Sequence, residues 1–135
     1  MEHYTLIETP PPAEVYRRLR VATGMYPKTE KAATLGLRGT WYGVHVRTAT
    51  EIVGMGRIIG DGGCFFQFTD IAVLPAHQGR GLGTRIMVVL IEHLEATAPS
   101  SALVSLFADG DAWRLYQKFG FEPSAPRSLG MWRVL

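Results

Sequence analysis

The sequence has little cysteine, no long apolar run and no strong excess of one charge. Its single cysteine, Cys64, excludes an internal disulfide framework and a zinc site built on paired cysteines. No apolar stretch approaches the ~18 residues of a membrane-spanning helix, and the first twelve residues lack the basic start and apolar centre of a signal peptide. We therefore expect a cytoplasmic protein that does not bind a membrane.

The composition excludes a disordered chain and gives only weak support to nucleic-acid binding. Hydrophobic residues make up 47% and charged residues 19% of the 135 residues, a balance typical of a folded domain. The formal net charge of +2 is too small to indicate nucleic-acid binding by itself. We expect no nucleic-acid partner, although the cluster at Arg17, Arg18 and Arg20 keeps that alternative open. The length fits one domain over residues 1–135.

Hydrophobic periodicity predicts a mixed α/β chain. Short turns join the strands expected over residues 40–48, 51–59 and 64–74, which predicts an antiparallel meander. The helix expected over residues 83–96 then makes a crossover, so the strand at 102–107 should run parallel to the strand at 64–74. Further strands are expected at residues 4–8, near Phe121 and at 131–135, and further helices at 13–22, 29–37 and 111–119.

A glycine-rich segment after the longest predicted strand carries the main functional signal. In residues 70–84 (DIAVLPAHQGRGLGT), Gly79, Gly81 and Gly83 come just before an amphipathic helix. Glycines let the backbone approach a ligand, and the free N–H groups of a helix N-terminus attract phosphate. The spacing differs from that of dinucleotide-binding loops, and no P-loop lysine is present. A glycine-rich loop without a ligand remains an open alternative.

Two blocks of the sequence together resemble the GNAT superfamily of N-acetyltransferases. The first, residues 78–83 (QGRGLG), is similar to the superfamily's acetyl-CoA loop. The second, residues 109–121 (DGDAWRLYQKFGF), is similar to a block that usually begins with asparagine. Here Asp109 can accept hydrogen bonds but has no amide N–H to donate. Residues 70–83 and the ending Gly130-Met131-Trp132 also resemble the serotonin N-acetyltransferase-like branch.

The resemblance implies a GNAT fold and an acetyl-CoA site without a metal. The fold would have about six to seven strands in a mostly antiparallel sheet, a splayed parallel pair, and helices on both faces. The backbone of the strand before the loop would bind the pantetheine arm, and the loop would bind the pyrophosphate. The implied acetyl-CoA residues are Ile71, Ala72, Val73, Gln78, Gly79, Arg80, Gly81, Leu82, Gly83, Thr84, Asp109, Ala112 and Tyr116.

The implied reaction is attack of a neutral primary amine on a thioester, in a ternary complex. On the resemblance, Tyr116 would protonate the leaving thiolate and the N–H of Val73 would stabilise the oxyanion. Tyr116 could instead serve only core packing. An alkylammonium must first lose a proton, so Asp70 is a candidate base or the start of a water relay, with an anchoring role also open. Further candidates for the base are Glu30, Asp61 and His45.

The acceptor amine is the part of the reaction that the sequence specifies least. Candidate acceptor-binding residues are the aromatic side chains Tyr26, Trp41, Phe66 and Phe68, which would suit an arylalkylamine. Protein lysines and amino sugars remain open acceptors. A non-catalytic acyl-CoA-binding sensor module is the alternative from another class, and a homodimer is an open expectation.

Overall fold

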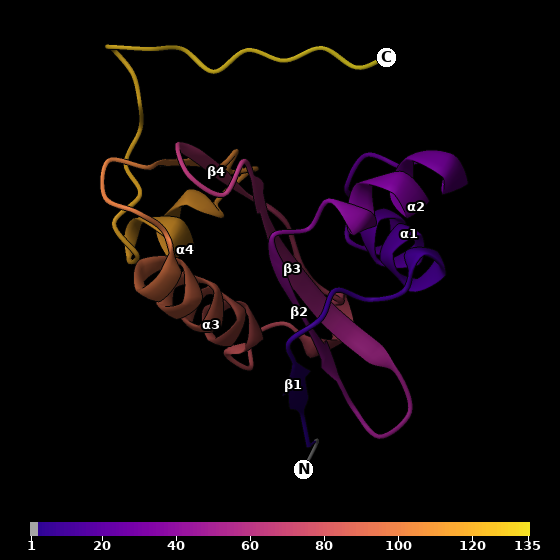
Figure 1. The fold of residues 1–135 in the computed structure, drawn as a ribbon. Helices are drawn as coiled ribbons and strands as arrows, with labels where there is room; N and C mark the ends of the chain where they lie inside the picture. The colour runs from indigo at the N-terminus through magenta and orange to yellow at the C-terminus, as the bar shows by residue number, and fades with distance from the viewer. Residues whose placement is uncertain (1–2) are drawn as a thin grey trace.

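A five-stranded sheet lies at the centre of the computed structural model, which describes residues 3–135 (Figure 1). The strands lie across the sheet in sequence order: β1 (Thr5–Ile7), β2 (Tyr42–Arg47), β3 (Ile52–Gly60), β4 (Phe65–Val73) and β5 (Leu103–Ser105). The helices are α1 (Ala13–Ala22), α2 (Glu30–Arg38), α3 (Leu82–Thr97) and α4 (Trp113–Gln117), and a short 3₁₀ helix covers Pro75–His77.

The strand directions confirm the predicted mixed sheet. β1 to β4 pair antiparallel in succession, whereas β4 and β5 pair parallel through the crossover helix α3. β5 pairs with β4 only from Phe65 to Gln67, although β4 continues to Val73. The parallel pair is therefore splayed, and the second half of β4 has no neighbour on its β5 side within the described residues.

A bulge divides β4 into two registers. The pairing with β3 shifts between Met55 and Arg57, and Asp70 on the opposite strand has a left-handed φ of 60°. Aspartate tolerates this conformation better than most residues with a Cβ. Because side chains alternate between the faces of a strand, the bulge resets which residues of β4 point to which face.

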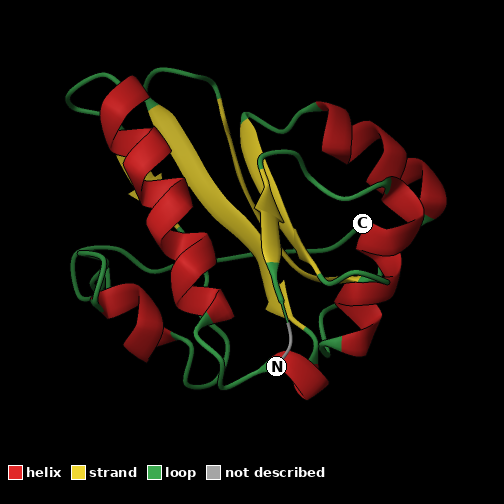
Figure 2. Ribbon diagram, turned by 90° about the horizontal axis from the view of Figure 1, so that it is seen from below, coloured by secondary structure: helices red, strands yellow, loops and turns green. Residues whose placement is uncertain are grey.

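Helices cover both faces of the sheet, as predicted (Figure 2). On one face, Ile86, Met87 and Leu90 of α3 pack into a core with the strands and Tyr116 of α4. On the other face, Tyr16 and Leu19 of α1 pack with Ala33 of α2 and with residues of β3 and β4. The glycine-rich loop between β4 and α3 lies at one end of this three-layered arrangement.

The C-terminal part of the chain differs from the prediction. The sheet has five strands instead of six to seven, because the strands expected near Phe121 and over residues 131–135 do not form. These segments do not reach a sheet edge within the described chain, so they have no ladder to join. The predicted strand at 102–107 and helix at 111–119 are shortened to β5 and α4.

Helix length and side-chain clustering in residues 3–135 bear on membrane insertion and metal binding. No helix in this range is long and apolar enough to cross a membrane. Within the same range, histidine, cysteine, aspartate and glutamate side chains do not gather in groups of three or more that could hold a metal ion.

Candidate functional site

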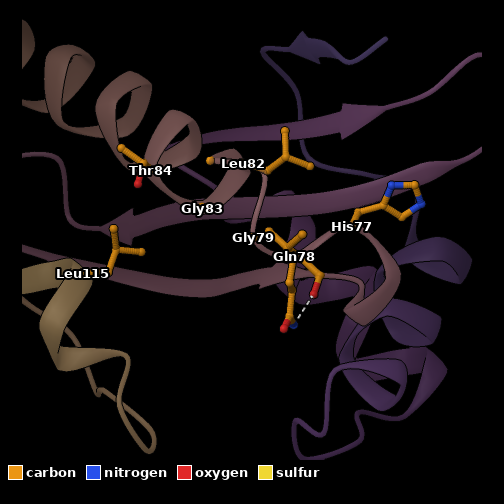
Figure 3. Close-up of a pocket in the computed structure, with 9 residues that line it drawn as sticks. His77, Gln78, Gly79, Leu82, Gly83, Thr84 and Leu115 are labelled. Atoms are coloured by element: carbon orange, nitrogen blue, oxygen red, sulfur yellow. Dashed lines mark hydrogen bonds between the residues drawn. The ribbon is translucent and has the colours of Figure 1, made fainter. Parts of the chain in front are cut away.

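A cavity of about 260 Å³ lies where β4 ends and α3 begins (Figure 3). β4 contributes its last residue, the loop and the first turn of α3 form one wall, and α4 closes the other side with Leu115. The cavity brings together two sequence blocks more than thirty positions apart in the chain. Its lining residues are Val73, His77, Gln78, Gly79, Gly81, Leu82, Gly83, Thr84 and Leu115.

The conformation of the loop depends on two glycines. Gly79 has a φ of 76° and Gly81 a φ of 79°, both in the left-handed region that residues with a Cβ adopt at a cost of roughly 1–2 kcal/mol. No heavy atom lies within 4 Å of a Cβ built on either glycine, so the requirement is conformational and not one of space. The open space beside them leaves the loop backbone accessible from the cavity.

The N-terminus of α3 is suited to bind an anion. Its N-cap residue is Gly81, whose lack of a side chain leaves the first N–H groups of this 16-residue helix without a side-chain acceptor. The helix dipole adds positive potential at the same point. Because Gly81, Gly83 and Thr84 line the cavity, these N–H groups lie where a phosphate could accept from them.

The end of β4 presents its backbone to the cavity. The N–H of Leu74 donates to the carbonyl of Val53 at 2.8 Å, and antiparallel strands alternate bonded and non-bonded positions. The peptide groups of Val73 therefore point away from β3, toward the side where β5 has ended. The side-chain amide Nε2 of Gln78 donates to the carbonyl oxygen of Val73 at 3.0 Å (Figure 3).

Tyr116 lies in the core on α4 and is not among the residues that line the cavity. Tyr116 is 8% exposed and packs edge-on against Phe121, while its neighbour Leu115 lines the cavity itself. Burial, and secondarily the negative charge of Asp109, raises the pKa of Tyr116 above its ordinary value of 10.0. The phenol therefore remains protonated at neutral pH and can donate a proton to a thiolate. Asp109 is exposed and Ala112 is half-buried at the start of α4.

Tyr4, just before β1, bonds to residues of the glycine-rich loop and of the 3₁₀ helix before it. The hydroxyl of Tyr4 accepts a hydrogen bond from Nη1 of Arg80 at 2.6 Å and pairs with Nδ1 of His77 at 2.8 Å. Nη1 of Arg85 donates to the backbone carbonyl of Tyr4 at 3.2 Å. Arg80 is thus bonded to Tyr4 and is not a lining residue of the cavity. Sequence reasoning missed Tyr4 because no motif links it to a loop more than seventy positions away.

Asp70 is buried in a cluster of charges on the opposite side of β4. Its Oδ1 accepts from the Tyr16 hydroxyl at 2.9 Å and from Nη1 of Arg20, and its Oδ2 accepts from Nε of Arg57 at 2.6 Å. The Asp70 side chain is 2% exposed, and those of Arg20 and Arg57 are 11% exposed. The two guanidinium groups also bond the carbonyls of Tyr26 and Gly36. The cluster therefore ties β4 to α1, α2 and the segment between them.

The remaining candidate bases are engaged elsewhere. Asp61 caps the β3–β4 turn, where its Oδ1 accepts from the N–H groups of Gly63, Cys64 and Phe65, and these bonds lower its pKa. His45 is buried on β2, with Nδ1 2.6 Å from the carbonyl of Thr9. Glu30 begins α2, on the opposite face of the sheet from α3. None of these three lines the cavity.

The four aromatic residues predicted to bind the acceptor lie in different parts of the fold. Phe66 and Phe68 are each 2% exposed and belong to the core under α3, and neither lines this cavity. Trp41 packs edge-on against Phe66, with the ring centroids 4.6 Å apart. Tyr26 lies between α1 and α2 and is 61% exposed. The four aromatic residues therefore do not form one binding surface, and Ala72 is also buried, on the face covered by α1 and α2.

The chain is similar to known acetyltransferases in both sequence and fold. Residues 39–123 match the family model described as "Acetyltransferase (GNAT) domain". A probable acetyltransferase of unknown function from meticillin-resistant Staphylococcus aureus is 41% identical, with a TM-score of 0.94, over 98% of this chain and 100% of the other.

Two curated relatives match over part of their length. The uncharacterized N-acetyltransferase ycf52 of Porphyra purpurea is 35% identical over 74 residues, which are 55% of this chain and 41% of the relative. The GCN5-related N-acetyltransferase 2, chloroplastic, of Arabidopsis thaliana is 32% identical over 81 residues, which are 60% of this chain and 31% of the relative. The chain thus spans 41% and 31% of the length of these two relatives. Neither is named as a serotonin N-acetyltransferase, so they do not support the narrower branch resemblance.

Proposed function

The chain belongs to the GNAT acetyltransferase family, and from that membership we propose that it transfers the acetyl group of acetyl-CoA to a primary amine. The observation that carries the proposal is the cavity itself. One space is bordered by an unpaired strand end, by the N–H groups of a helix N-terminus and by the helix that holds Tyr116. These are the features that an extended amide-containing arm, a pyrophosphate and a leaving thiolate require.

Each part of the cavity fits one part of acetyl-CoA. The peptide groups of Ile71 and Val73 have no strand partner on the β5 side, so they can pair with the pantetheine amides as an added strand would. The N–H groups from Gly79 to Thr84 can bind the pyrophosphate. The side-chain amide of Gln78 donates to the Val73 carbonyl, so binding of a pantetheine amide there would require that bond to open.

Acetyl-CoA supplies an activated acetyl group on a thioester. In the proposed reaction the amine nitrogen forms a bond to the thioester carbonyl carbon, and the bond from that carbon to sulfur breaks. The N–H of Val73 stabilises the charge that develops on the carbonyl oxygen. Burial raises the pKa of Tyr116, so its hydroxyl is protonated at neutral pH and can donate that proton to the departing sulfur. The amine nitrogen loses a proton as the amide forms, and water carries this proton back to the phenolate.

The contacts of Asp70 support the anchoring role over the base role. Both carboxylate oxygens accept bonds from Arg20, Arg57 or Tyr16, and the side chain is almost fully buried. An incoming ammonium would have to displace a guanidinium to reach it. We propose that the amine loses its proton to water at the entrance of the cavity, and that Asp70 shapes the bulge that aims the end of β4.

The acceptor proposal is a primary amine that approaches from the side of α1 and α2. Tyr26, on the segment between those helices, is the exposed member of the predicted aromatic set. An arylalkylamine remains the first acceptor to test because an exposed tyrosine can stack on an aromatic ring. Lysine side chains and amino sugars are the competing acceptor classes.

The proposal is tested by thiol release from acetyl-CoA, with binding measured separately by calorimetry. The amine panel contains serotonin, tryptamine, a polyamine, an amino sugar and a lysine peptide, each with a blank that lacks the amine. Thiol release that requires an amine supports transfer, and the preferred amine assigns the acceptor class. Binding of acetyl-CoA without release with any amine would contradict catalysis on these acceptors and favour an acyl-CoA-binding module.

The role of Tyr116 is tested with the Tyr116→Phe variant. We expect kcat to fall by about 10²–10⁴-fold, with little change in acetyl-CoA affinity. Tyr42→Phe is the matched control, because Tyr42 also has a raised pKa but lies on β2, stacked on His93 and bonded to Glu8. An unchanged kcat in Tyr116→Phe would show that this phenol is not the acid.

A further inference from the structure

The layer formed by α1, α2 and the segment between them carries most of the positive charge of the chain. Residues 13–38 contain six basic and two acidic side chains, a net charge of +4, whereas the whole chain carries +2. This layer lies on the side of the sheet opposite to α3 (Figure 1). Five of its six basic residues are exposed: Arg17, Arg18, Lys28, Lys31 and Arg38. One side of the sheet is therefore strongly basic, although the chain as a whole is close to neutral.

The sixth basic residue of this basic layer, Arg20, belongs to the buried cluster around Asp70. Arg20 and Arg57 share the single carboxylate of Asp70. Within residues 3–135, neither guanidinium forms an ion pair with a second carboxylate. The cluster therefore keeps one positive charge that no acid balances, and this charge adds to that of the layer above it.

Each guanidinium in the cluster has one nitrogen without a hydrogen-bond partner in the described chain. Arg20 donates through Nε to the carbonyl of Tyr26 and through Nη1 to Asp70. Arg57 donates through Nε to Asp70 and through Nη1 to the carbonyl of Gly36. Among residues 3–135, every buried side-chain nitrogen has a partner, so the two Nη2 atoms, which have none, must reach solvent. Two cationic donors therefore remain available to a ligand.

The cluster lies beside the strand end at which the reaction is proposed. Asp70 precedes Val73 by three residues on β4, which corresponds to about 10 Å along a strand. Between them, Ala72 packs against α1 and α2, whereas Val73 lines the cavity assigned to acetyl-CoA. An acceptor that reaches the thioester from the other side of β4 therefore passes the basic layer.

We propose that the acceptor is an amine that also carries a negatively charged group, a carboxylate or a phosphate, which the basic layer and the Nη2 donors of Arg20 and Arg57 recognise. This inference rests on the proposed acetyl transfer and narrows its acceptor. A polyamine meets charges of its own sign and is repelled, whereas an anionic group at about 10 Å is attracted. Guanidinium N–H groups form strong, charge-assisted bonds to carboxylate and phosphate oxygens alike.

Acceptor pairs that differ only in the anionic group test the inference. Thiol release is compared between tryptophan and tryptamine for the carboxylate, and between glucosamine 6-phosphate and glucosamine for the phosphate. We express kcat/KM per neutral amine, because the anionic group also changes the pKa of the amine. The anionic member of one pair should be preferred by about 10-fold or more, as expected for a bond to a charged group. Because exposed charges contribute, this preference should shrink at about 1 M salt.

Two variants test whether the basic layer is the origin of the preference. Arg20→Lys keeps a positive charge beside Asp70 but has one terminal nitrogen in place of three, so the preference should fall by about 5-fold or more. Lys28→Glu reverses an exposed charge of the layer and should lower the preference by about 2–5-fold. The matched control Lys118→Glu makes the same change of charge at the end of α4, which packs on the α3 side, and should leave the preference unchanged. The preference is a ratio within one variant, so it does not depend on how much of that variant is folded.

A binding measurement separates this inference from the proposed acetyl transfer. Indole-3-propionate has a carboxylate but no amine, and with CoA bound it should bind about 10-fold or more tightly than indole-3-propionamide in calorimetry. Thiol release without a preference for the anionic member of either pair would overturn the inference and leave acetyl transfer intact. A preference that neither Arg20→Lys nor Lys28→Glu lowers would also overturn it. If no amine supports thiol release, acetyl transfer is contradicted, and equal binding of the propionate and its amide would then overturn the inference as well.

Discussion

Replacing Asp70 with asparagine separates the two roles that the sequence left open for this residue. The change keeps the size of the side chain and suits the left-handed backbone at this position, so the bulge itself gains no strain. It removes the negative charge that faces Arg20 and Arg57, whose guanidinium groups would then be buried without a carboxylate. Breaking a buried ion pair by removing one partner costs about 3–5 kcal/mol.

The expected loss of stability is large because the Asp70 side chain is only 2% exposed. The two ion pairs share one carboxylate, so their losses do not add, and about 3–5 kcal/mol applies to the cluster as a whole. At roughly 3–4 °C per kcal/mol for a chain of this length, Tm should fall by about 10–20 °C. Thermal unfolding followed by circular dichroism, with and without acetyl-CoA, measures this shift.

Kinetics at a temperature well below the lowered Tm complete the test. If Asp70 is an anchor, the folded variant should retain the rise of kcat/KM with pH that reports deprotonation of the amine. If Asp70 is the base, that rise should be altered and kcat should fall by about 10²–10⁴-fold in the variant that remains folded. A Tm within 2 °C of the unaltered protein, roughly the shift expected from less than 1 kcal/mol, would refute the anchoring argument.

A double-mutant cycle provides the control for this experiment. Arg57→Met removes one guanidinium while keeping an unbranched apolar side chain of similar reach, and the double variant with Asp70→Asn leaves neither charge of that pair. The double variant should be more stable than the sum of the two single losses predicts, by about 0.5–3 kcal/mol. Strict additivity of the two losses would contradict a direct interaction between Asp70 and Arg57.

Three further predictions concern the loop, through Tyr4 and Gly81, and the buried Tyr16. Tyr4→Phe removes the hydroxyl that bonds Arg80 and His77, so KM for acetyl-CoA should rise by about 3–10-fold with kcat unchanged; an unchanged KM would contradict a positioning role. Gly81→Ala forces a Cβ into a left-handed conformation and should weaken acetyl-CoA binding by about 5–30-fold in calorimetry, whereas the control Gly39→Ala, at a φ of −86°, should not. Burial raises the pKa of Tyr16 above 10.0, so its contribution to stability is present below pH 10 and is lost as the pH rises through the folded-state pKa; Tm that stays constant well above pH 10 would contradict this.

Much of the fold could be predicted because its signals are local. The turns between β2, β3 and β4 predicted their antiparallel order, and the helix after the glycine-rich loop predicted the parallel pair. The helix at residues 13–22 coincides with α1. The strand predicted over residues 131–135 does not form. An apolar segment of strand-like composition becomes a strand only where it pairs with a neighbouring strand.

Some features of the candidate site could likewise be predicted from the sequence, whereas others required the tertiary structure. The sequence by itself indicated the family through two motif blocks, residues 78–83 and 109–121. It also predicted the glycine-rich turn that opens α3, because such a turn and the helix start depend on residues next to one another in the chain. Only the tertiary structure decided that Asp70 is sealed by Arg20 and Arg57, since those partners lie 50 and 13 positions away. It also decided that Phe66 and Phe68 face the core under α3, because alternation predicts that two strand residues share a face but not which layer covers it.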